Sequence, residues 1–488
     1  FAIEMLSIWI AAEDMDPELM RMEPSLLNAD SPFVALHHEV VNWLQARRQS
    51  TVFDDSHLQV MFSQCKKLIE RLQKRGAVVG SSLNTAYLLE RLSQTLERLE
   101  TLMAIFVSNR YLPRRILLLT GCFARAAAEK HSITRLWKQS SRLISRSITQ
   151  NAGDHGEHYI TRDKKEYWAM FYSAAGGGVL IALMALFKIY LGSIIDDKVW
   201  KGIAEGLNYG LGFMVIFMLH FTVATKQPAM TAARFAEAVE KTPQGKSVNM
   251  KLAQLLVDVF RSQSIAVLGN VLIAMGLAAL IAFGYQYKTG EPLMNADQIA
   301  YQLHSIDPFA GTLWFAAIAG VWLFCSGIIS GYFDNRSNYL NMRMRLTQHP
   351  LLKKLMSEKS RVKFANYMHE NYGSLIGNLC FGMLLGITGV VGYLTHLPLD
   401  IRHVAFSSAN VGYIAVSGHF TYSLLLQCIA FVLLIGLVNL IVSFSLTLWV
   451  ALRSLNAEIE SWWPIWYEVC QIVKKRPLSL FLPVQLDK

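Results

Sequence analysis

Hydrophobic and polar positions divide the chain into a mixed first part and an apolar second part. After residue 169 the sequence contains six runs of about 20 apolar residues, the length that an α-helix needs to cross a bilayer. We interpret them as six membrane spans, at residues 170–191, 207–224, 264–285, 309–331, 373–395 and 422–452. The last run is longer than a bilayer requires, so it should tilt or project beyond the membrane.

Residues 1–160 contain no such run and instead show the period of amphipathic helices. An apolar stripe with charged residues between its members is formed by Leu88, Leu92, Leu96, Leu99 and Met103. Ser81 or Ser82 stands just before this stripe and is suited to cap the helix. The pattern predicts an all-α protein in which a helical domain at 1–160 precedes a polytopic membrane helix bundle at 161–488.

The basic residues between the spans predict how the bundle is oriented. The segments after the second, fourth and sixth spans hold 19 Lys and Arg residues, whereas those after the first, third and fifth hold 4. Because Lys and Arg accumulate on the cytoplasmic side of a membrane, both termini should be cytoplasmic. We therefore expect a multi-pass protein of the bacterial inner membrane whose N-terminal domain, trimmed at its start, lies in the cytoplasm.

Composition and charge agree with this placement. Hydrophobic residues make up 53% of the 488 residues and charged residues 17%, against roughly 25% charge in soluble domains, which excludes a disordered protein and a typical soluble enzyme. The net charge is +10, and residues 110–146 alone carry nine Lys and Arg with one acid. Attraction to anionic lipid headgroups accounts for this stretch. The expected partners are the lipid bilayer, its anionic headgroups and a protein at residues 1–160; we do not expect nucleic acid.

An internal repeat relates the third and fifth spans. Residues 269–285 read GNVLIAMGLAALIAFGY and residues 377–393 read GNLCFGMLLGITGVVGY, and T-x-x-P-L follows at 289–293 and 395–399. The first span, at 177–192, matches more weakly. Each repeat would be one helical hairpin followed by a basic segment, so the bundle should consist of repeated hairpins in the same orientation.

Polar residues inside the spans are the first candidates for function. The repeat places Asn270 and Asn378 at the same depth, and His220 falls about one turn inside the end of the second span. An amide in hydrocarbon must find a partner, so these residues either line a polar path or join neighbouring helices; we favour the second reading. The G-x-x-x-G pair Gly382 and Gly386 should let two helices approach closely.

Two further features stand at the ends of the spans. Lys226, Gln227 and Pro228 form a cytoplasmic elbow after the second span, either an interfacial turn or a gate. Lys188, near the end of the first span, should extend its ammonium group to the membrane interface.

The sequence DHGEH, just before the first span, contains a candidate metal site. Asp154, His155 and His158 offer carboxylate and imidazole ligands for a divalent metal, although a hydrogen-bonded junction is the reading we favour. The sequence contains no phosphate-binding loop, nucleophile elbow or zinc-helix motif, so we expect no cofactor and no catalytic residues.

Two longer segments carry a family resemblance. They are DHGEHYITRDKKEYWAM, at 154–170, and LHFTVATKQPAMTAA, at 219–233. With them the chain resembles a bacterial membrane-protein family labelled "site-specific recombinase", and the resemblance covers both the N-terminal part and the spans. The label implies DNA recombination, but the family's motifs imply no catalytic residue for this chain.

Three hypotheses for function follow. The first is a transport, channel or lipid-handling component of the inner membrane that uses the repeated hairpins. The second is a membrane-anchored scaffold or regulator that acts through residues 1–160. The third is the site-specific DNA recombinase that the resemblance implies. The first two make the chain a protein without enzymatic activity, which is the reading we favour.

Overall fold

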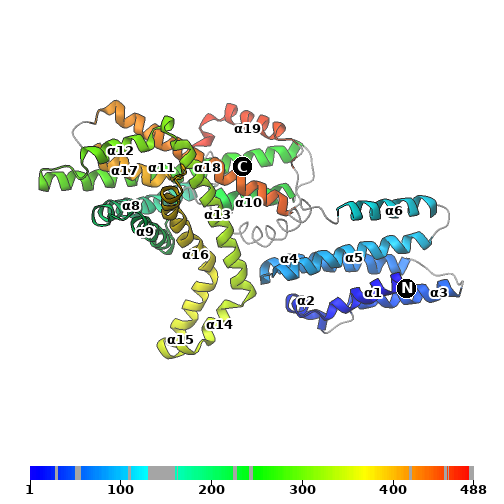
Figure 1. Ribbon diagram of the computed structural model, residues 1–488. Coiled ribbons are helices and arrows are strands. Elements are labelled where there is room, and N and C mark those ends of the chain that lie inside the picture. Colours follow the sequence, from blue (N-terminus) through cyan, green and yellow to red (C-terminus); the bar gives the residue numbers. More distant parts are fainter. Residues whose placement is uncertain are drawn as a thin grey trace. The chain divides into compact units, whose positions relative to one another are not determined.

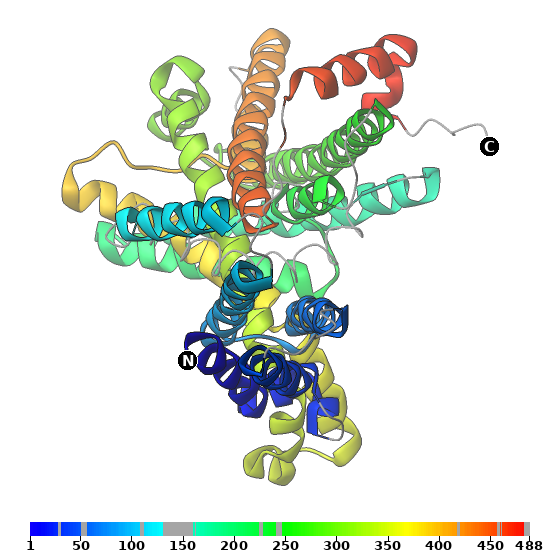
Figure 2. The same ribbon diagram turned by 90° about the vertical axis from the view of Figure 1, so that its right-hand side faces the viewer.

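The structure is a computed structural model of the chain, and every regular element that it describes is a helix (Figures 1 and 2). The described residues are 1–27, 31–49, 56–107, 112–129, 160–161, 163–223, 228–240, 246–416, 420–455, 459 and 461–482. The predicted all-α class is confirmed.

Five of the described helices are long and apolar enough to cross a membrane. They are α8 (Lys164–Ile194), α11 (Lys246–Thr289), α13 (Thr312–Tyr339), α16 (Glu358–Thr395) and α18 (Tyr422–Leu455). Each contains most or all of one expected span, which confirms a polytopic helical bundle. Several are much longer than the roughly 20 residues that a bilayer crossing requires.

The second expected span differs from its prediction. It forms α9 (Lys198–Met218), which starts nine residues earlier than residue 207 and ends six residues before residue 224. Lys201 and Glu205 lie in its first turns, and α9 is not among the five helices that are apolar enough over a membrane-length stretch. His220, expected inside the span, lies beyond the helix end, is exposed and has a left-handed φ of 59°. That placement was wrong because the apolar run continues past the helix end, so hydropathy does not mark the turn.

The chain divides into two compact units, which do not follow its order. One unit comprises 1–147 together with 335–365, and the other comprises 148–334 together with 366–488. Besides the N-terminal part, the first unit therefore includes the basic segment between the fourth and fifth expected spans. Both α13 and α16 contribute residues to each unit.

The first unit is a bundle of amphipathic helices. These are α1 (Ala2–Ala12), α2 (Pro17–Met22), α3 (Pro32–Arg48), α4 (Ser56–Val79), α5 (Leu83–Val107), α6 (Leu112–Glu129), α14 (Met342–Gln348) and α15 (Pro350–Leu355). The predicted stripe on α5 is confirmed: Leu92, Leu96 and Leu99 are buried in one core with Phe33 and Trp43. Ser82 caps α5, because its Oγ accepts a hydrogen bond from the backbone N–H of Thr85 at 3.0 Å.

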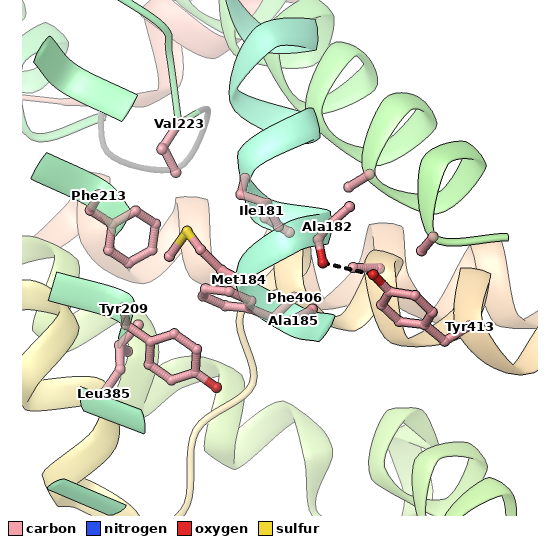
Figure 3. Packing of buried hydrophobic residues seen from close by; sticks show 14 of the residues in the cluster. Ile181, Ala182, Met184, Ala185, Tyr209, Phe213, Val223, Leu385, Phe406 and Tyr413 are labelled. Carbon is pink, nitrogen blue, oxygen red and sulfur yellow. Dashed lines mark hydrogen bonds between the residues drawn. The ribbon is translucent and has the colours of Figure 1, made fainter. Parts of the chain in front are cut away.

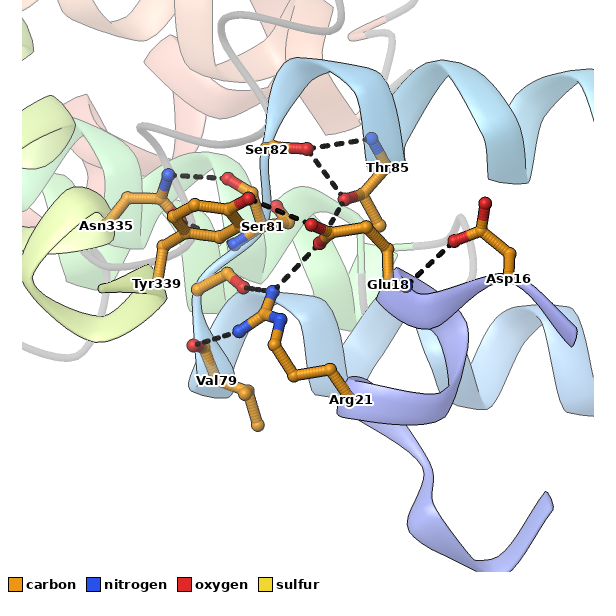
Figure 4. A network of polar contacts seen from close by, with 10 residues as sticks. Asp16, Glu18, Arg21, Val79, Ser81, Ser82, Thr85, Asn335 and Tyr339 are labelled. Atoms are coloured by element: carbon orange, nitrogen blue, oxygen red, sulfur yellow. Dashed lines mark hydrogen bonds and ion pairs between the residues drawn. The ribbon is translucent and has the colours of Figure 1, made fainter. Parts of the chain in front are cut away.

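A polar network joins the N-terminal helices to the end of α13 within this unit (Figure 4). The Tyr339 hydroxyl donates to Glu18 at 2.8 Å, and the Arg21 guanidinium lies 4.6 Å from the centre of the Tyr339 ring. Asn335 forms two hydrogen bonds with the backbone of Ser81, at 3.0 and 2.8 Å. Segments more than 250 residues apart in the sequence are thereby held together.

The second unit contains the five long helices and α9, with four shorter helices. The shorter ones are α10 (Pro228–Glu240), α12 (Ala296–Ile306), α17 (Val404–Ala415) and α19 (Trp463–Lys475). Its main core collects apolar residues from α8, α9, α11, α13, α16 and α17. Figure 3 shows part of this core, in which the Tyr413 hydroxyl donates to the Ala182 carbonyl at 2.8 Å. The hydroxyl is thus satisfied inside an apolar core.

Glycines set the closest helix contact in this unit. A Cβ added at Gly382 of α16 would lie 2.0 Å from the backbone N of Gly210 in α9, and one at Gly386 would lie 2.4 Å from Gly206. The backbones therefore touch over two turns, as the G-x-x-x-G spacing predicts.

Candidate functional site

Helices α12 and α17 were not expected from the sequence, and they create the candidate site. Each lies between the two helices of a predicted hairpin, and each begins a few residues after a T-x-x-P-L motif. α12 and the start of α17 meet the end of α8 and the start of α9 around one cavity. The three connections with few basic residues thus converge at the same end of the second unit.

The cavity has a volume of about 500 Å³ and a lining that is polar and apolar in nearly equal parts, and we call it the hairpin pocket. Its lining residues come from five segments: Lys188, Ile189 and Gly192; Lys201, Glu205 and Tyr209; Met294, Asn295, Asp297, Gln298, Tyr301, Gln302 and Ser305; Asp400, Ile401, Arg402 and His403; and Phe406, Ser407 and Asn410. This volume lies in the range of small-molecule sites.

An ion pair between α8 and α9 forms one wall of the hairpin pocket. The Lys188 Nζ lies 3.3 Å from the Glu205 Oε2, and both side chains are at least half buried. The ammonium also lies 5.6 Å from the ring centre of Tyr209. Lys188 thus has a charged partner on the neighbouring helix, and its extension toward the membrane interface stays a prediction.

A second ion pair lies on the opposite segment of the lining. The Arg402 Nη1 lies 2.6 Å from the Asp400 Oδ2, and its Nε donates to the Ser305 carbonyl at the end of α12 at 2.8 Å. The guanidinium also lies 5.4 Å from the ring centre of Phe315. Arg402 therefore fixes the connection before α17 against α12 and α13.

His403 closes the inner side of the hairpin pocket. Its ring is 1% exposed and packs edge-on against Phe213 and Phe381, with Phe406 tilted beside it. Burial among these rings disfavours the charged imidazolium and lowers the pKa of His403 to about 4. His403 is therefore neutral near pH 7.

The lining offers charges of both signs to a ligand. Three basic side chains, three carboxylates, several amides and two phenols line the hairpin pocket. Such a site suits a small polar molecule that carries both positive and negative groups. Each charged group of the ligand can take the place of one partner in an existing ion pair. In the described part of the chain, no group of three or more His, Cys, Asp or Glu residues is placed to hold a metal ion.

The predicted polar residues of the spans lie outside the hairpin pocket. Asn270 is 1% exposed, and its Nδ2 donates to the carbonyls of Ala174 at 2.5 Å and Thr222 at 2.9 Å. Asn270 therefore joins α11 to α8 and to the chain after α9. Asn378 donates to the Ser374 carbonyl of its own helix at 2.8 Å. The repeat thus places two asparagines in similar positions with different partners.

The remaining candidates cannot be placed in the site. Lys226 and Gln227 lie outside the described residues, as do Asp154, His155 and His158. Pro228 is the first residue of α10.

Sequence reasoning missed the residues that form the hairpin pocket, although signals for them exist. α12 carries apolar residues at the helical spacing, and its Asn295 and Gln298 form a capping box. α17 is a 12-residue, mostly apolar helix, too short to cross a membrane and typical of a buried helix. Lys201 and Glu205 stand directly before an apolar run, which marks them as residues that need polar partners.

These observations define a class: an all-α bundle of the membrane-spanning type that encloses a polar pocket. The chain matches the family described as Site-specific recombinase over residues 1–483. The chain belongs to this family, which confirms the resemblance found in the sequence. No curated protein and no solved structure matches it.

Proposed function

We propose that the chain is a component of the bacterial inner membrane that binds a small polar solute in the hairpin pocket and transports it. The observation that carries this proposal is a polar cavity of about 500 Å³ among helices long enough to span a bilayer. Charged groups are costly in such surroundings and are retained where a solute or ion must be held.

The exposed surface of α9 supports six spans rather than five. Trp200, Leu207, Leu211, Val215 and Met218 are exposed and follow one another at spacings of seven, four, four and three residues. They form one apolar stripe along the whole helix. Lys201 and Glu205 line the hairpin pocket instead. α9 thus presents an apolar face to lipid, although it is not one of the five helices that composition alone marks as apolar enough to span.

The charge pattern supports an orientation with both termini in the cytoplasm. The hairpin pocket is built from the connections that hold few Lys and Arg residues, at 192–206, 286–308 and 396–421. By the positive-inside rule these connections face away from the cytoplasm. The pocket would therefore open toward the periplasm.

A ligand screen tests the proposal. The purified chain in lipid nanodiscs is heated with a panel of cationic, anionic, zwitterionic and neutral polar molecules. We expect a subset to raise the unfolding temperature, and Glu205→Gln to abolish the shift. Lys198→Met is the matched control, because Lys198 also lies on α9 but stacks on Tyr393 outside the pocket. Equal shifts in all three proteins, or no shift with any molecule, would contradict the proposal.

The family description favours DNA recombination as a second candidate function. The hairpin pocket does bring Arg402, His403, Tyr209 and Tyr301 together. Its volume is nevertheless small for a double helix, whose major groove alone is about 12 Å wide and 8.5 Å deep, and its carboxylates would repel phosphate. Cleavage or rejoining of supercoiled DNA by the purified chain, abolished by Arg402→Ala, would establish this function in place of transport.

A scaffold role for residues 1–160 is a separate proposal. It is supported by the large helical core of the first unit. If this unit binds a partner, deletion of residues 1–107 should affect the cell as much as loss of the whole protein does. The same deletion should leave ligand binding in nanodiscs intact.

A further inference from the structure

Helix α19 has two apolar faces, of which only one is covered. Ile465 is buried, and Val469 and Ile472 pack against the same cluster, which contains residues of α10, α11 and α18. These residues recur at the helical spacing and explain why α19 attaches to the second unit.

The opposite face of α19 is aromatic and exposed. Trp463, Trp466 and Tyr467 are 78%, 54% and 56% exposed, and Cys470 is exposed on the same face. The last turn of the helix contains Lys474 and Lys475, and Arg476 follows it. Tryptophan and tyrosine beside a basic cluster are typical of helices that lie in the headgroup region of an anionic membrane.

We propose that α19 is an interfacial helix. It inserts its aromatic face into the cytoplasmic leaflet, and its basic end binds anionic lipid headgroups. The inference uses the membrane placement proposed above but does not depend on the ligand of the hairpin pocket.

The short connection after α18 keeps α19 close to the end of that helix. Only seven residues join α18 to α19, which limits the distance between them to about 25 Å. Leu448 and Ala451, near the end of α18, pack in the same cluster as Ile465. α19 therefore lies beside the last turns of a helix that crosses the membrane.

The surface of α18 shows where the leaflet ends. Its exposed apolar residues include Leu426, Leu433 and Ile441, and exposed aromatic rings stand near both ends of the helix, at Tyr422 and Trp449. The two rings are separated by about 40 Å of helix, close to the full thickness of a bilayer with its headgroups.

The end of α18 that is next to α19 also has a cation at this boundary. Arg453 lies 5.4 Å from the ring centre of Trp449, a pairing suited to the membrane interface. The aromatic face of α19 begins ten residues further along the chain.

Spin labelling tests the inference in the full chain. A nitroxide is attached to Cys470 after the other five cysteines are replaced by serine, and the protein is placed in nanodiscs that contain anionic lipid. We expect the label to relax with oxygen, which partitions into lipid, severalfold more than with a water-soluble nickel complex. A label at Lys475→Cys, on the side of the helix, should show the opposite preference.

One further label and one triple substitution make every outcome decisive. Leu433→Cys lies on the exposed stripe of α18 and should be accessible to oxygen only; if it is not, the membrane placement fails. If Leu433→Cys behaves as expected but Cys470 reacts with nickel, or with neither reagent because a protein covers it, the inference for α19 is wrong. Replacing Trp463, Trp466 and Tyr467 by serine should raise nickel access at Cys470 severalfold.

Discussion

At the scale of single residues, buried amides provide hydrogen bonds that lipid cannot supply. Asn270 donates to carbonyls on two other segments, whereas Asn378 donates within its own helix. Asn270→Leu should therefore destabilise the protein by about 1 to 2 kcal/mol. Thermal unfolding in detergent measures this loss, and an unchanged unfolding temperature would contradict the role assigned to Asn270.

The ion pair between α8 and α9 should show direct coupling. Lys188→Met and Glu205→Gln each leave one charged group of a half-buried pair without its partner, at a cost of about 1 to 3 kcal/mol, below the range for a fully buried pair. The double variant should lose less than the sum of the two, with a coupling above about 0.5 kcal/mol. Additive losses in a double-mutant cycle would show that the pair does not interact.

His403 should make stability depend on pH in a defined window. Its folded pKa of about 4 lies below the ordinary value of 6.5, so the unfolded chain binds a proton more readily. Above pH 6.5 neither state binds this proton, so His403 does not lower the free energy of unfolding. As pH falls from 6.5 toward 4, the unfolded chain is protonated first, and the free energy of unfolding decreases by up to about 1.4 kcal/mol per pH unit. Denaturant titrations between pH 4 and 8 measure this slope.

The variant His403→Phe separates this effect from other acidic transitions. Phenylalanine fits among Phe213, Phe381 and Phe406 and does not titrate in this range. Its titrations should be flatter than those of the natural chain below pH 6.5. The same slope in both proteins would rule out His403 as the cause.

At the scale of elements, the spans were predicted, whereas the helices between them were missed although the sequence contains signals for them. Runs of about 20 apolar residues identify a helix because lipid tolerates no unpaired backbone. α12 and α17 are short, and their positions depend on contacts with α8, α11 and α18 that no local pattern encodes. The end of α9 was missed because apolar residues follow it. The Lys188–Glu205 pair was missed because a charge near a helix end fits an interfacial position equally well.

The close contact between α9 and α16 requires that residue 382 has no Cβ. Gly382→Ala would place a Cβ 2.0 Å from the backbone of Gly210, so the helices must separate and the unfolding temperature should fall by several degrees. Gly389→Ala is the control on the same helix, because no atom lies within 4 Å of its Cβ. It should be neutral or stabilising, since alanine favours a helix. Equal effects of both changes would contradict the close contact.

At the scale of the whole molecule, the expected repeat would explain how distant segments form one site. Hairpins in the same orientation would bring their connections to the same side, and the second and third connections each contain an additional helix. The repeat and the orientation stay predictions from motif spacing and charge. The sequence could not predict the hairpin pocket, because Lys188, Glu205 and Arg402 are separated by up to 214 positions and meet only after the hairpins pack.

The central claim is that a hydrated pocket enters the bundle from the side opposite the basic connections. Its most direct test is the labelling of single cysteines in intact cells with a membrane-impermeant maleimide, in a chain without other cysteines. Asn410→Cys lines the hairpin pocket, whereas its neighbour Ala409→Cys is fully buried in the core. Met250→Cys is an exposed position at the start of α11, on the basic side.

We predict that Asn410→Cys reacts from outside the cell, that Ala409→Cys does not react, and that Met250→Cys reacts only after the cells are opened. If, in intact cells, Asn410→Cys does not react and Met250→Cys does, the account is contradicted.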